Sequence, residues 1–389
     1  MKKYITHKPS LRSKATADDE SVTSEDPELQ DFDPKIGREG PIPNDNKSAR
    51  RTCLFLTTCN LIAACVAITL LVTLYYIPHR QQATRTIRSS LPASISNVVV
   101  FGDSWSDTGN VYDASNGEIP KSPPYWEGRY SNGKIYVDFL QDHFGPKTAI
   151  DNYAWGGATT DSSIIEAYSS FLDRAVPSVD EQIAVYLNKK SSLTTDDAQP
   201  SLYILASGYN EYWWWVRRNF DEAAEETPLA DIAMLVHQVT TAIVDSLALL
   251  GSGNSNGADQ DHFVVFNLPP MHDFPEAVGY SQSKLLVYKV ITDMHNQLLS
   301  EKLLALQEKS VKFTSVHLLD LHSFCEDVLE NPLAYGFASI PDQQAPCLSD
   351  TNDICADPFG SVFWDLYHPT THFHYQMSRE ILKILGQSE

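Results

Sequence analysis

The sequence predicts an α/β fold in which helices cover both faces of a parallel sheet. From residue 97 onward, short apolar segments alternate with longer amphipathic ones. The short segments are rich in β-branched and aromatic residues, which favour strands, and the longer segments have the apolar spacing of helices. Apolar strands separated by helices are typical of a parallel sheet buried between two helical layers. About 290 residues remain for this part, which fits one domain.

The predicted elements alternate in chain order. Strands are expected at 97–101, 148–153, 202–206, 262–267 and 312–319. Helices are expected at 178–187, 229–250, 281–307 and 371–385. Ligands of an open parallel sheet bind beyond the carboxyl ends of its strands, so polar residues that follow a strand are candidates for a functional site.

The chain before residue 97 has a different character. Residues 1–52 are rich in acidic residues, Ser, Lys and Pro and are expected to be a disordered cytoplasmic tail. Residues 53–77 form an uncharged apolar run of 25 residues, long enough to cross the roughly 30 Å hydrocarbon core of a bilayer. We interpret this run as a transmembrane signal anchor and residues 78–96 as a linker. The domain is then 97–389.

The alternative for the apolar run is a cleaved signal peptide. That alternative requires a leader of about 50 residues before the apolar core, and the core itself is too long. The tail carries ten Lys and Arg residues, which favours a cytoplasmic N-terminus and a lumenal or extracellular domain, that is, a single-pass type II membrane protein. The one Asn-x-Ser/Thr sequon, at Asn46, lies on the proposed cytoplasmic side and gives this orientation no support.

Charge and cysteine content restrict the partners and the compartment. The formal net charge is −21, and because the tail is neutral and the linker adds three arginines, the domain carries roughly −24. Such a surface repels nucleic acid and other polyanions. Cys347 and Cys355 flank a loop-like segment and are candidates for a short disulfide in an oxidising compartment, which leaves Cys325 as a buried thiol.

One predicted strand leads directly into a polar turn. Residues 98–110 read VVVFGDSWSDTGN, so Ser104 follows a buried strand immediately. This position places Ser104 at the ligand-binding edge of the sheet, where a serine can act as a nucleophile. The alternative is that Ser104 only caps a following helix.

A second segment, FWDLYHP, contains the partners that a nucleophilic serine needs. Serine is a poor nucleophile near neutral pH and requires an imidazole base, which a carboxylate usually orients. Asp365 and His368 stand three residues apart, so one short turn can present both side chains. The arrangement predicts a triad of Ser104, Asp365 and His368, with His368 as general base. The alternative is that Asp365 caps the last helix and His368 is a surface residue.

Four segments together resemble the GDSL or SGNH hydrolases. They are the GDS after the first strand, NYAWGGATT at 152–160, SGYNEYW at 207–213 and DxxHP near the end. The longer segments FGDSWSDTGN, NYAWGGATT and FWDLYHPTTHFH are similar to those of fungal acetylesterases of carbohydrate esterase family sixteen. The resemblance covers 97–389 and implies a three-layer α/β/α sandwich, flavodoxin-like, with a five-stranded parallel sheet.

The same resemblance implies an oxyanion hole. Its donors are the backbone N–H groups of Ser104 and Gly157 and the side-chain amide of Asn210. Gly156 and Gly157 follow a predicted strand, and glycine permits a close approach of the backbone to a ligand. The alternatives are a plain tight turn for the glycines and a loop amide for Asn210. The chain departs from the family pattern at Glu211, where an aspartate is usual, and we expect this to affect substrate positioning.

Aromatic residues stand beside these positions in the chain. Trp105, Tyr209 and Trp213 are candidates for lining a substrate cleft, and core packing is the alternative. For at least two of the three consecutive tryptophans 213–215, core packing is the expected role.

Other polar residues near the triad are assigned structural roles. Asp103, Asp107 and Asn110 are expected to hydrogen-bond the turn after the strand. His372 and His374 have a spacing seen in metal sites, but no acidic or cysteine partner stands nearby. No metal and no cofactor are therefore expected.

Together these features predict a serine esterase that hydrolyses carboxylic esters through an acyl-serine intermediate. The resemblance to acetylesterases favours short acyl groups, above all acetyl on sugar hydroxyls, and the acidic domain suits a neutral substrate. Three alternatives stay open: a lipase that acts on longer acyl esters, an acyltransferase that uses the same triad, and a membrane-tethered binding module without catalysis, against which the complete triad argues.

Overall fold

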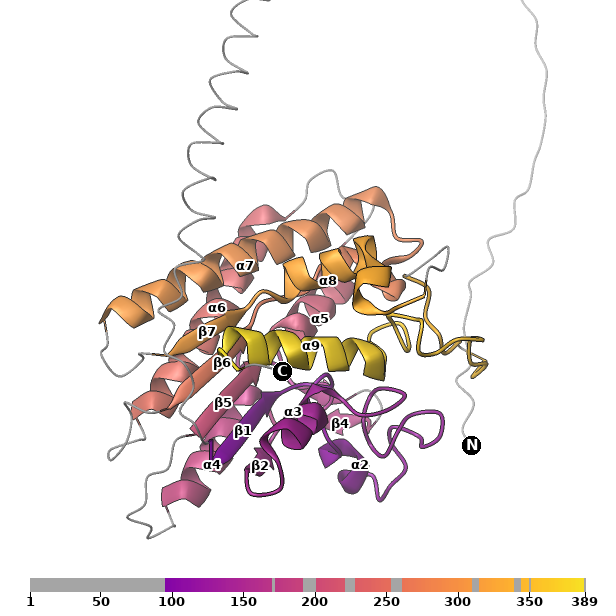
Figure 1. The fold of residues 1–389 in the computed structure, drawn as a ribbon. Coiled ribbons are helices and arrows are strands. Elements are labelled where there is room, and N and C mark those ends of the chain that lie inside the picture. Colours follow the sequence, from indigo (N-terminus) through magenta and orange to yellow (C-terminus); the bar gives the residue numbers. More distant parts are fainter. Residues whose placement is uncertain are drawn as a thin grey trace, which may run out of the picture. The chain divides into compact units, whose positions relative to one another are not determined.

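A computed structural model describes residues 95–169, 172–191, 201–220, 228–252, 261–309, 315–338, 344–349 and 351–387 of the protein. The expected tail, the expected anchor and nearly all of the linker lie outside these residues. The described part contains a five-stranded sheet in the order β2-β1-β5-β6-β7 (Figure 1). Every neighbouring pair in it is parallel, which confirms the predicted class of fold.

The elements follow the alternation expected from the sequence. The strands of the main sheet are β1 (Asn97–Gly102), β2 (Ala149–Asn152), β5 (Ser201–Ala206), β6 (His262–Phe266) and β7 (Val316–Leu319). The short strands β3 (Tyr168–Ser169) and β4 (Arg174–Ala175) form an antiparallel pair. The helices are α2 (Asn110–Ala114), α3 (Tyr136–Phe144), α4 (Val179–Ser191), α5 (Tyr209–Asn219), α6 (Leu229–Ser252), α7 (Gln282–Lys309), α8 (Leu321–Glu330) and α9 (Thr371–Ile384), with short 3-10 turns η2 (Met271–Asp273), η3 (Pro275–Ala277) and η4 (Pro332–Tyr335).

Alternate residues of the strands build the two helix-covered faces. Val98 and Val100 pack into one hydrophobic cluster, together with buried side chains of α3, α8 and α9. Val99 and Phe101 pack into the other, together with buried side chains of α4, α5, α6 and α7. Both faces of the sheet are therefore buried, and the domain has three layers, with α3 and α9 in front of the sheet in Figure 1.

Several helices were not expected from the sequence: α3, α5 and α8 are the longest of them. In α5 the sequence YNEYWWW has weak helix propensity, and the helix forms because Tyr212 and Val216 are buried against the sheet. Helix α8 begins at a typical N-cap residue, because the Asp320 side chain accepts a hydrogen bond from the Ser323 N–H.

Helix α6 is long and apolar enough to cross a membrane by length and composition, and it is the single candidate among the described residues. Its buried residues recur three and four positions apart, for example Ile232, Val236 and Val239. They belong to the same hydrophobic cluster as Val99 and Phe101. This is the pattern of a helix with one face in a protein core. The predicted anchor at 53–77 is a different segment and lies outside the described residues.

Cys347 and Cys355 are joined by a disulfide. The bond closes a small loop in which Leu348 and Ile354 form an isolated antiparallel bridge. Cys325 on α8 is a buried free thiol, and burial raises its pKa well above the usual value, so it stays protonated.

Candidate active site

The turn after β1 carries Ser104 beyond the carboxyl edge of the sheet. Gly102 ends β1 opposite Ala206 of β5, and a Cβ atom at Gly102 would lie 2.6 Å from the Ala206 carbonyl oxygen. A glycine is therefore required for the two strands to stay this close. The chain then turns back, with the N–H groups of Ser106 and Asp107 both donating to the Asp103 carbonyl.

The structure brings Ser104, His368 and Asp365 into one hydrogen-bonded line. The Ser104 Oγ lies 2.8 Å from the His368 Nε2. The His368 Nδ1 lies 2.9 and 2.8 Å from the two Asp365 carboxylate oxygens. This is the geometry in which an imidazole can take a proton from a serine hydroxyl while a carboxylate holds its other nitrogen.

A hairpin-like loop before α9 presents Asp365 and His368 together. Phe363 and Pro369 form a β-bridge, and the backbone N–H groups of Tyr367 and His368 each donate to the Asp365 Oδ1 at 2.8 Å. Helix α9 is capped by Thr370, whose hydroxyl accepts from the Phe373 N–H, and not by Asp365.

The environment of Asp365 favours its charged form. Burial by itself would raise the pKa of Asp365, but the charge and the hydrogen bond of His368, with donors from Tyr125 and the Tyr367 backbone, hold this pKa below its usual value. Asp365 is thus a carboxylate at neutral pH and can stabilise a positive charge on His368.

The glycine turn after β2 is tied to the start of α5. Gly157 has φ of 91°, and a Cβ atom there would lie 2.5 Å from the Tyr168 carbonyl oxygen, so a larger residue is excluded. The Asn210 side chain donates from Nδ2 to the Ala158 carbonyl oxygen at 2.8 Å. The glycine turn that holds Gly157 and the first turn of α5 that holds Asn210 are therefore joined by a hydrogen bond.

Glu211 fastens the far end of this glycine turn. Its side chain is fully buried, and its Oε1 accepts from the Thr160 N–H, while its Oε2 has no hydrogen-bond partner. The Thr160 hydroxyl in turn pairs with the Ser207 hydroxyl at 2.7 Å. Burial raises the pKa of Glu211 from 4.5 to about 7. Glu211, the residue that departs from the family pattern, thus supports the glycine turn through its hydrogen bond with Thr160.

Replacing Glu211 by Gln is expected to remove a pH-dependent loss of stability. A carboxyl whose folded-state pKa is raised destabilises the fold as pH rises from the unfolded to the folded value, here from 4.5 to about 7. The full cost above pH 7 is about 3 kcal/mol. Urea unfolding at pH 5 and pH 8 should therefore show wild type losing about 2 kcal/mol relative to Glu211→Gln. Equal pH dependence of the two proteins would contradict this.

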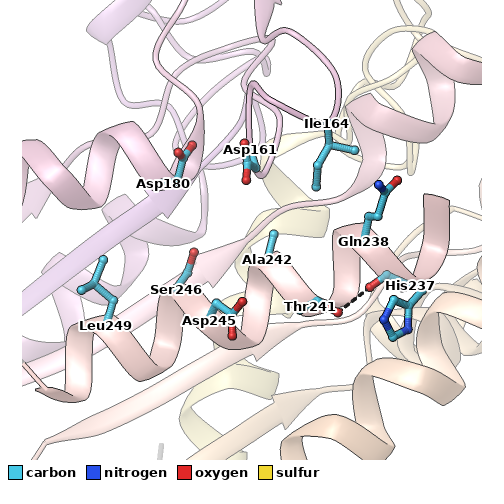
Figure 2. A pocket seen from close by; sticks show the side chains of 10 residues that line it. All are labelled: Asp161, Ile164, Asp180, His237, Gln238, Thr241, Ala242, Asp245, Ser246 and Leu249. Carbon is cyan, nitrogen blue, oxygen red and sulfur yellow. Dashed lines mark hydrogen bonds between the residues drawn. The ribbon is translucent and has the colours of Figure 1, made fainter. Parts of the chain in front are cut away.

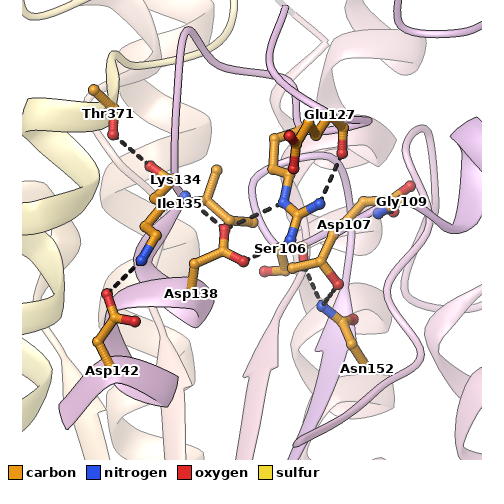
Figure 3. Close-up of polar contacts among 12 residues, drawn as sticks. Ser106, Asp107, Gly109, Glu127, Lys134, Ile135, Asp138, Asp142, Asn152 and Thr371 are labelled. Atoms are coloured by element: carbon orange, nitrogen blue, oxygen red, sulfur yellow. Dashed lines mark hydrogen bonds and ion pairs between the residues drawn. The ribbon is translucent and has the colours of Figure 1, made fainter.

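Asp107 joins the turns that follow β1 and β2. Its carboxylate accepts from the N–H groups of Gly109, Asn110 and Val111 and from the Gly156 N–H at 2.9 Å. Burial nevertheless raises its pKa to about 6. Figure 3 shows Asp107 with Gly109 and the side chain of Asn152 close by.

Two neighbours of Asp107 support the same turns. The Asn110 amide donates to the carbonyls of Asn152 and Ala154, and the Asn152 amide donates to the Ser106 carbonyl. Asp103 accepts from the Trp105 N–H at 3.1 Å, and burial raises its pKa to about 6. Asp103 and Asn110, like Asp107, therefore hold the turns in place through hydrogen bonds to the backbone.

The three predicted cleft residues have different surroundings. The rings of Trp105 and Tyr209 both stack on Phe274, at centroid distances of 5.9 and 5.6 Å. Trp213 lies edge-on to Tyr367, the neighbour of His368, at 5.9 Å. Trp105 also reaches the loop that carries His368, because its indole N–H donates to the Tyr367 carbonyl at 3.0 Å.

Trp213 is fixed by a carboxylate from another element. Its indole N–H lies 2.8 Å from each oxygen of Glu276, on η3. The Tyr280 hydroxyl also donates to Glu276, and the Arg217 guanidinium lies over the Trp213 ring. Since the Glu276 N–H donates to the Leu366 carbonyl, this cluster is attached to the loop of Asp365 and His368.

Two tyrosines at the site were not found from the sequence. The Tyr125 hydroxyl donates to the Asp365 Oδ2 at 2.7 Å, and the Tyr130 ring lies 5.0 Å from the His368 ring. Both belong to the loop before α3, in which sequence reasoning placed no site residue. The aromatic cluster YWEGRY at 125–130 was the available indication.

His372 and His374 are buried side chains of α9 and not a pair facing solvent. His372 is stacked between Phe337 and Phe359, at 4.2 and 4.0 Å, and His374 packs beside Trp105. Among the described residues, no group of His, Cys, Asp and Glu side chains is arranged to hold a metal ion.

A groove of about 380 Å³ lies elsewhere on the domain. It runs along α6, between His237 and Leu249, and is closed on its other side by Asp161, Ile164 and Asp180 (Figure 2). No residue of the Ser104, His368 and Asp365 line is among those that line it.

Comparison with known proteins identifies the family. Residues 98–381 match the family model described as GDSL-like lipase/acylhydrolase, which is well over half of the chain. The chain belongs to this family. As a GDSL-type esterase it is a carboxylic ester hydrolase. The serine that is hydrogen-bonded to His368, Ser104, is the serine of its GDS segment.

Relatives of this GDSL esterase have several activities. The chain is 30% identical over 279 residues to a phosphatidylcholine-sterol acyltransferase of Aeromonas hydrophila, covering 71% of the chain and 69% of that protein. It is 24% identical over 307 residues to a thermolabile hemolysin of Vibrio parahaemolyticus, covering 75% of the chain and 64% of the hemolysin. It is 25% identical over 290 residues to an acetylesterase of Thermothelomyces thermophilus, covering 71% of the chain and 83% of the acetylesterase. The chain thus spans about two thirds of the length of the first two.

Proposed function

We propose that Ser104 is the nucleophile of this esterase, that His368 is its general base and that Asp365 orients His368. The observation that carries the proposal is the continuous line from the Ser104 Oγ through both ring nitrogens of His368 to Asp365. An imidazole with one nitrogen on a serine hydroxyl and the other on a carboxylate is in the tautomer that accepts the serine proton.

The reaction then proceeds in two acyl transfers. As the Ser104 Oγ attacks the ester carbonyl carbon, its proton passes to the His368 Nε2. The tetrahedral intermediate collapses when His368 gives this proton to the leaving alcohol oxygen, which produces the acyl-serine. A water molecule, deprotonated by His368, attacks the acyl carbon, and the Ser104 oxygen leaves with the proton.

The oxyanion of each tetrahedral intermediate needs hydrogen-bond donors. We assign this role to the backbone N–H groups of Ser104 and Gly157 and to the Asn210 amide. The assignment is supported by the contact of Asn210 with the glycine turn and by the positive φ of Gly157, which fixes the backbone of that turn. An amide nitrogen has two hydrogens, so a bond to Ala158 leaves one for a substrate oxygen.

Short acyl groups, above all acetyl on carbohydrate hydroxyls, are the proposed substrates. The relationship to an acetylesterase and the similarity of the GDS and DxxHP segments to carbohydrate esterase family sixteen support this.

A second candidate is acyl transfer to an alcohol by the same triad. The 30% identity to an acyltransferase favours it. The two reactions differ only in whether water or an acceptor alcohol attacks the acyl-serine. A lipase acting on longer acyl chains remains the third candidate.

We also propose that residues 53–77 anchor the enzyme as a single-pass type II membrane protein, with its catalytic domain lumenal or extracellular. The uncharged run of 25 residues supports an anchor. The Cys347–Cys355 disulfide supports an oxidising compartment for the domain.

The proposed substrate class is tested with p-nitrophenyl esters from acetate through butyrate to laurate, using the detergent-solubilised full chain. We expect kcat/KM to fall by about tenfold or more between acetate and laurate, because one or two methylenes too many for a closed pocket cost about 1–3 kcal/mol. A preference for laurate would overturn the short-acyl proposal. Adding sugar acceptors and following acylated product distinguishes hydrolysis from transfer.

A further inference from the structure

We propose that Tyr125 is a positioning residue of the active site: its phenolic hydroxyl orients the Asp365 carboxylate and reduces the negative charge that faces His368. This inference rests on the roles proposed above for Asp365 and His368. It adds a residue from a loop that is far from both in the chain.

The hydrogen bonds of Asp365 are divided between its two oxygens. The Oδ1 accepts from two backbone N–H groups, those of Tyr367 and His368. The Oδ2 accepts from the Tyr125 hydroxyl at 2.7 Å. The His368 Nδ1 lies within 2.9 Å of both oxygens. Without Tyr125, the Oδ2 would keep His368 as its only partner among these donors, and the carboxylate could rotate about its last bond.

Packing fixes the Tyr125 ring before any substrate binds. The ring lies edge-on to Trp364, with centroids 6.3 Å apart, and it packs in a small cluster with Trp364, Cys347 and Cys355. The Tyr130 ring also lies edge-on to it, with centroids 6.5 Å apart. The hydroxyl is therefore delivered to Asp365 by a side chain that has few other positions available, which is the property of a preorganised donor.

The disulfide loop and the Tyr125 loop thus form one support. The Cys347 N–H donates to the Phe363 carbonyl, just before the segment that carries Asp365. Burial and the nearby Asp365 charge raise the pKa of Tyr125, so the hydroxyl stays protonated and can donate at neutral pH.

Removing this donor changes the charge that His368 experiences. A carboxylate that loses a hydrogen bond holds more negative charge and stabilises a neighbouring imidazolium more strongly. His368 then stays protonated to higher pH and cannot accept the Ser104 proton. Among the described residues, the other titratable groups near His368 are Tyr130 from the same loop as Tyr125, Tyr367 beside His368 in the chain, Asp103 from the turn after β1 and His374 from α9. A Tyr125→Phe change leaves them in place.

The test compares Tyr125→Phe with Tyr335→Phe in the full chain. Tyr335 is a matched control, because its hydroxyl also donates to a carboxylate, that of Asp327, which is not part of the active site. We expect Tyr125→Phe to lower kcat about tenfold at neutral pH with KM nearly unchanged. We also expect the acidic limb of the kcat/KM profile to move up by about half a pH unit. In the background of Asp365→Asn, the same change should have no further effect, because its target is gone.

A second readout does not depend on turnover. The proton between the His368 Nδ1 and Asp365 is expected to give a far-downfield proton NMR resonance, whose pH titration in Tyr125→Phe should shift upward relative to wild type and Tyr335→Phe. If this titration and the pH profile match those of the control, the inference is overturned while the esterase proposal stands. If wild type shows no Ser104-dependent turnover, the proposed function fails, and the NMR titration still decides whether Tyr125 acts on the Asp365–His368 pair.

Discussion

Replacing Ser104 by Ala is expected to reduce kcat/KM on p-nitrophenyl acetate by about 10⁴- to 10⁶-fold. The change removes the only atom that bonds to the acyl carbon, while His368 and Asp365 keep their mutual hydrogen bond. Because Ser104 is part of a turn that other side chains hold, we expect the fold to persist. Circular dichroism and thermal unfolding, measured beside steady-state kinetics, check both statements.

Ser252→Ala is the matched control for this experiment. Its hydroxyl donates to the Leu249 carbonyl at the exposed end of α6, away from the Ser104 turn, so activity should stay at the wild-type level. A Ser104→Ala protein that is folded and retains more than a few per cent of wild-type turnover would show that another group is the nucleophile.

Replacing Asn210 by Ala should lower kcat by about 10²- to 10³-fold, the cost of losing one oxyanion donor. The effect should fall on kcat rather than KM, because the donor interacts most strongly with the charge of the tetrahedral intermediate. Stopped-flow or steady-state hydrolysis of p-nitrophenyl acetate measures the two constants separately.

Asn219→Ala on the same helix separates chemistry from structure. The Asn219 amide donates to the Trp215 carbonyl at the exposed end of α5, so its loss should cost little activity. Asn210→Ala also loses the bond to Ala158, which we expect to cost about 1 kcal/mol of stability. If kcat falls only in proportion to a loss of folded protein, the oxyanion role of Asn210 is wrong.

The sheet and the positions of Ser104, Asp365 and His368 were predictable because each depends on a local pattern. Runs such as VVVF before Gly102 form buried strands wherever helices can cover both faces, and the class of the sheet follows from their alternation with helices. Residues that follow parallel strands meet at one edge. The Ser104 position could therefore be placed at that edge without knowledge of the rest of the fold.

Other parts of the site depend on contacts that no local pattern encodes. The Tyr125 hydroxyl and its acceptor are 240 residues apart in the chain, and Tyr125 lies in a loop without periodicity. The three tryptophans of α5 look alike in the sequence, and Trp213 is distinguished by its contacts with Glu276, 63 residues later, and with Tyr367. Trp105 and Tyr209 could not be separated from Trp213, because the stacking partner that they share, Phe274, follows a different strand.

The proposed nucleophile and its proposed base come from opposite ends of the domain. Ser104 follows the first strand of the sheet, and His368, 264 residues later, immediately precedes the last helix. A ribosome therefore exposes the serine before the imidazole, and a chain that ends before residue 368 has the proposed nucleophile without its proposed base. With the proposed roles, ester cleavage needs the turn after β1 and the loop before α9 to be in place together, so activity reports that both ends of the domain have folded against each other.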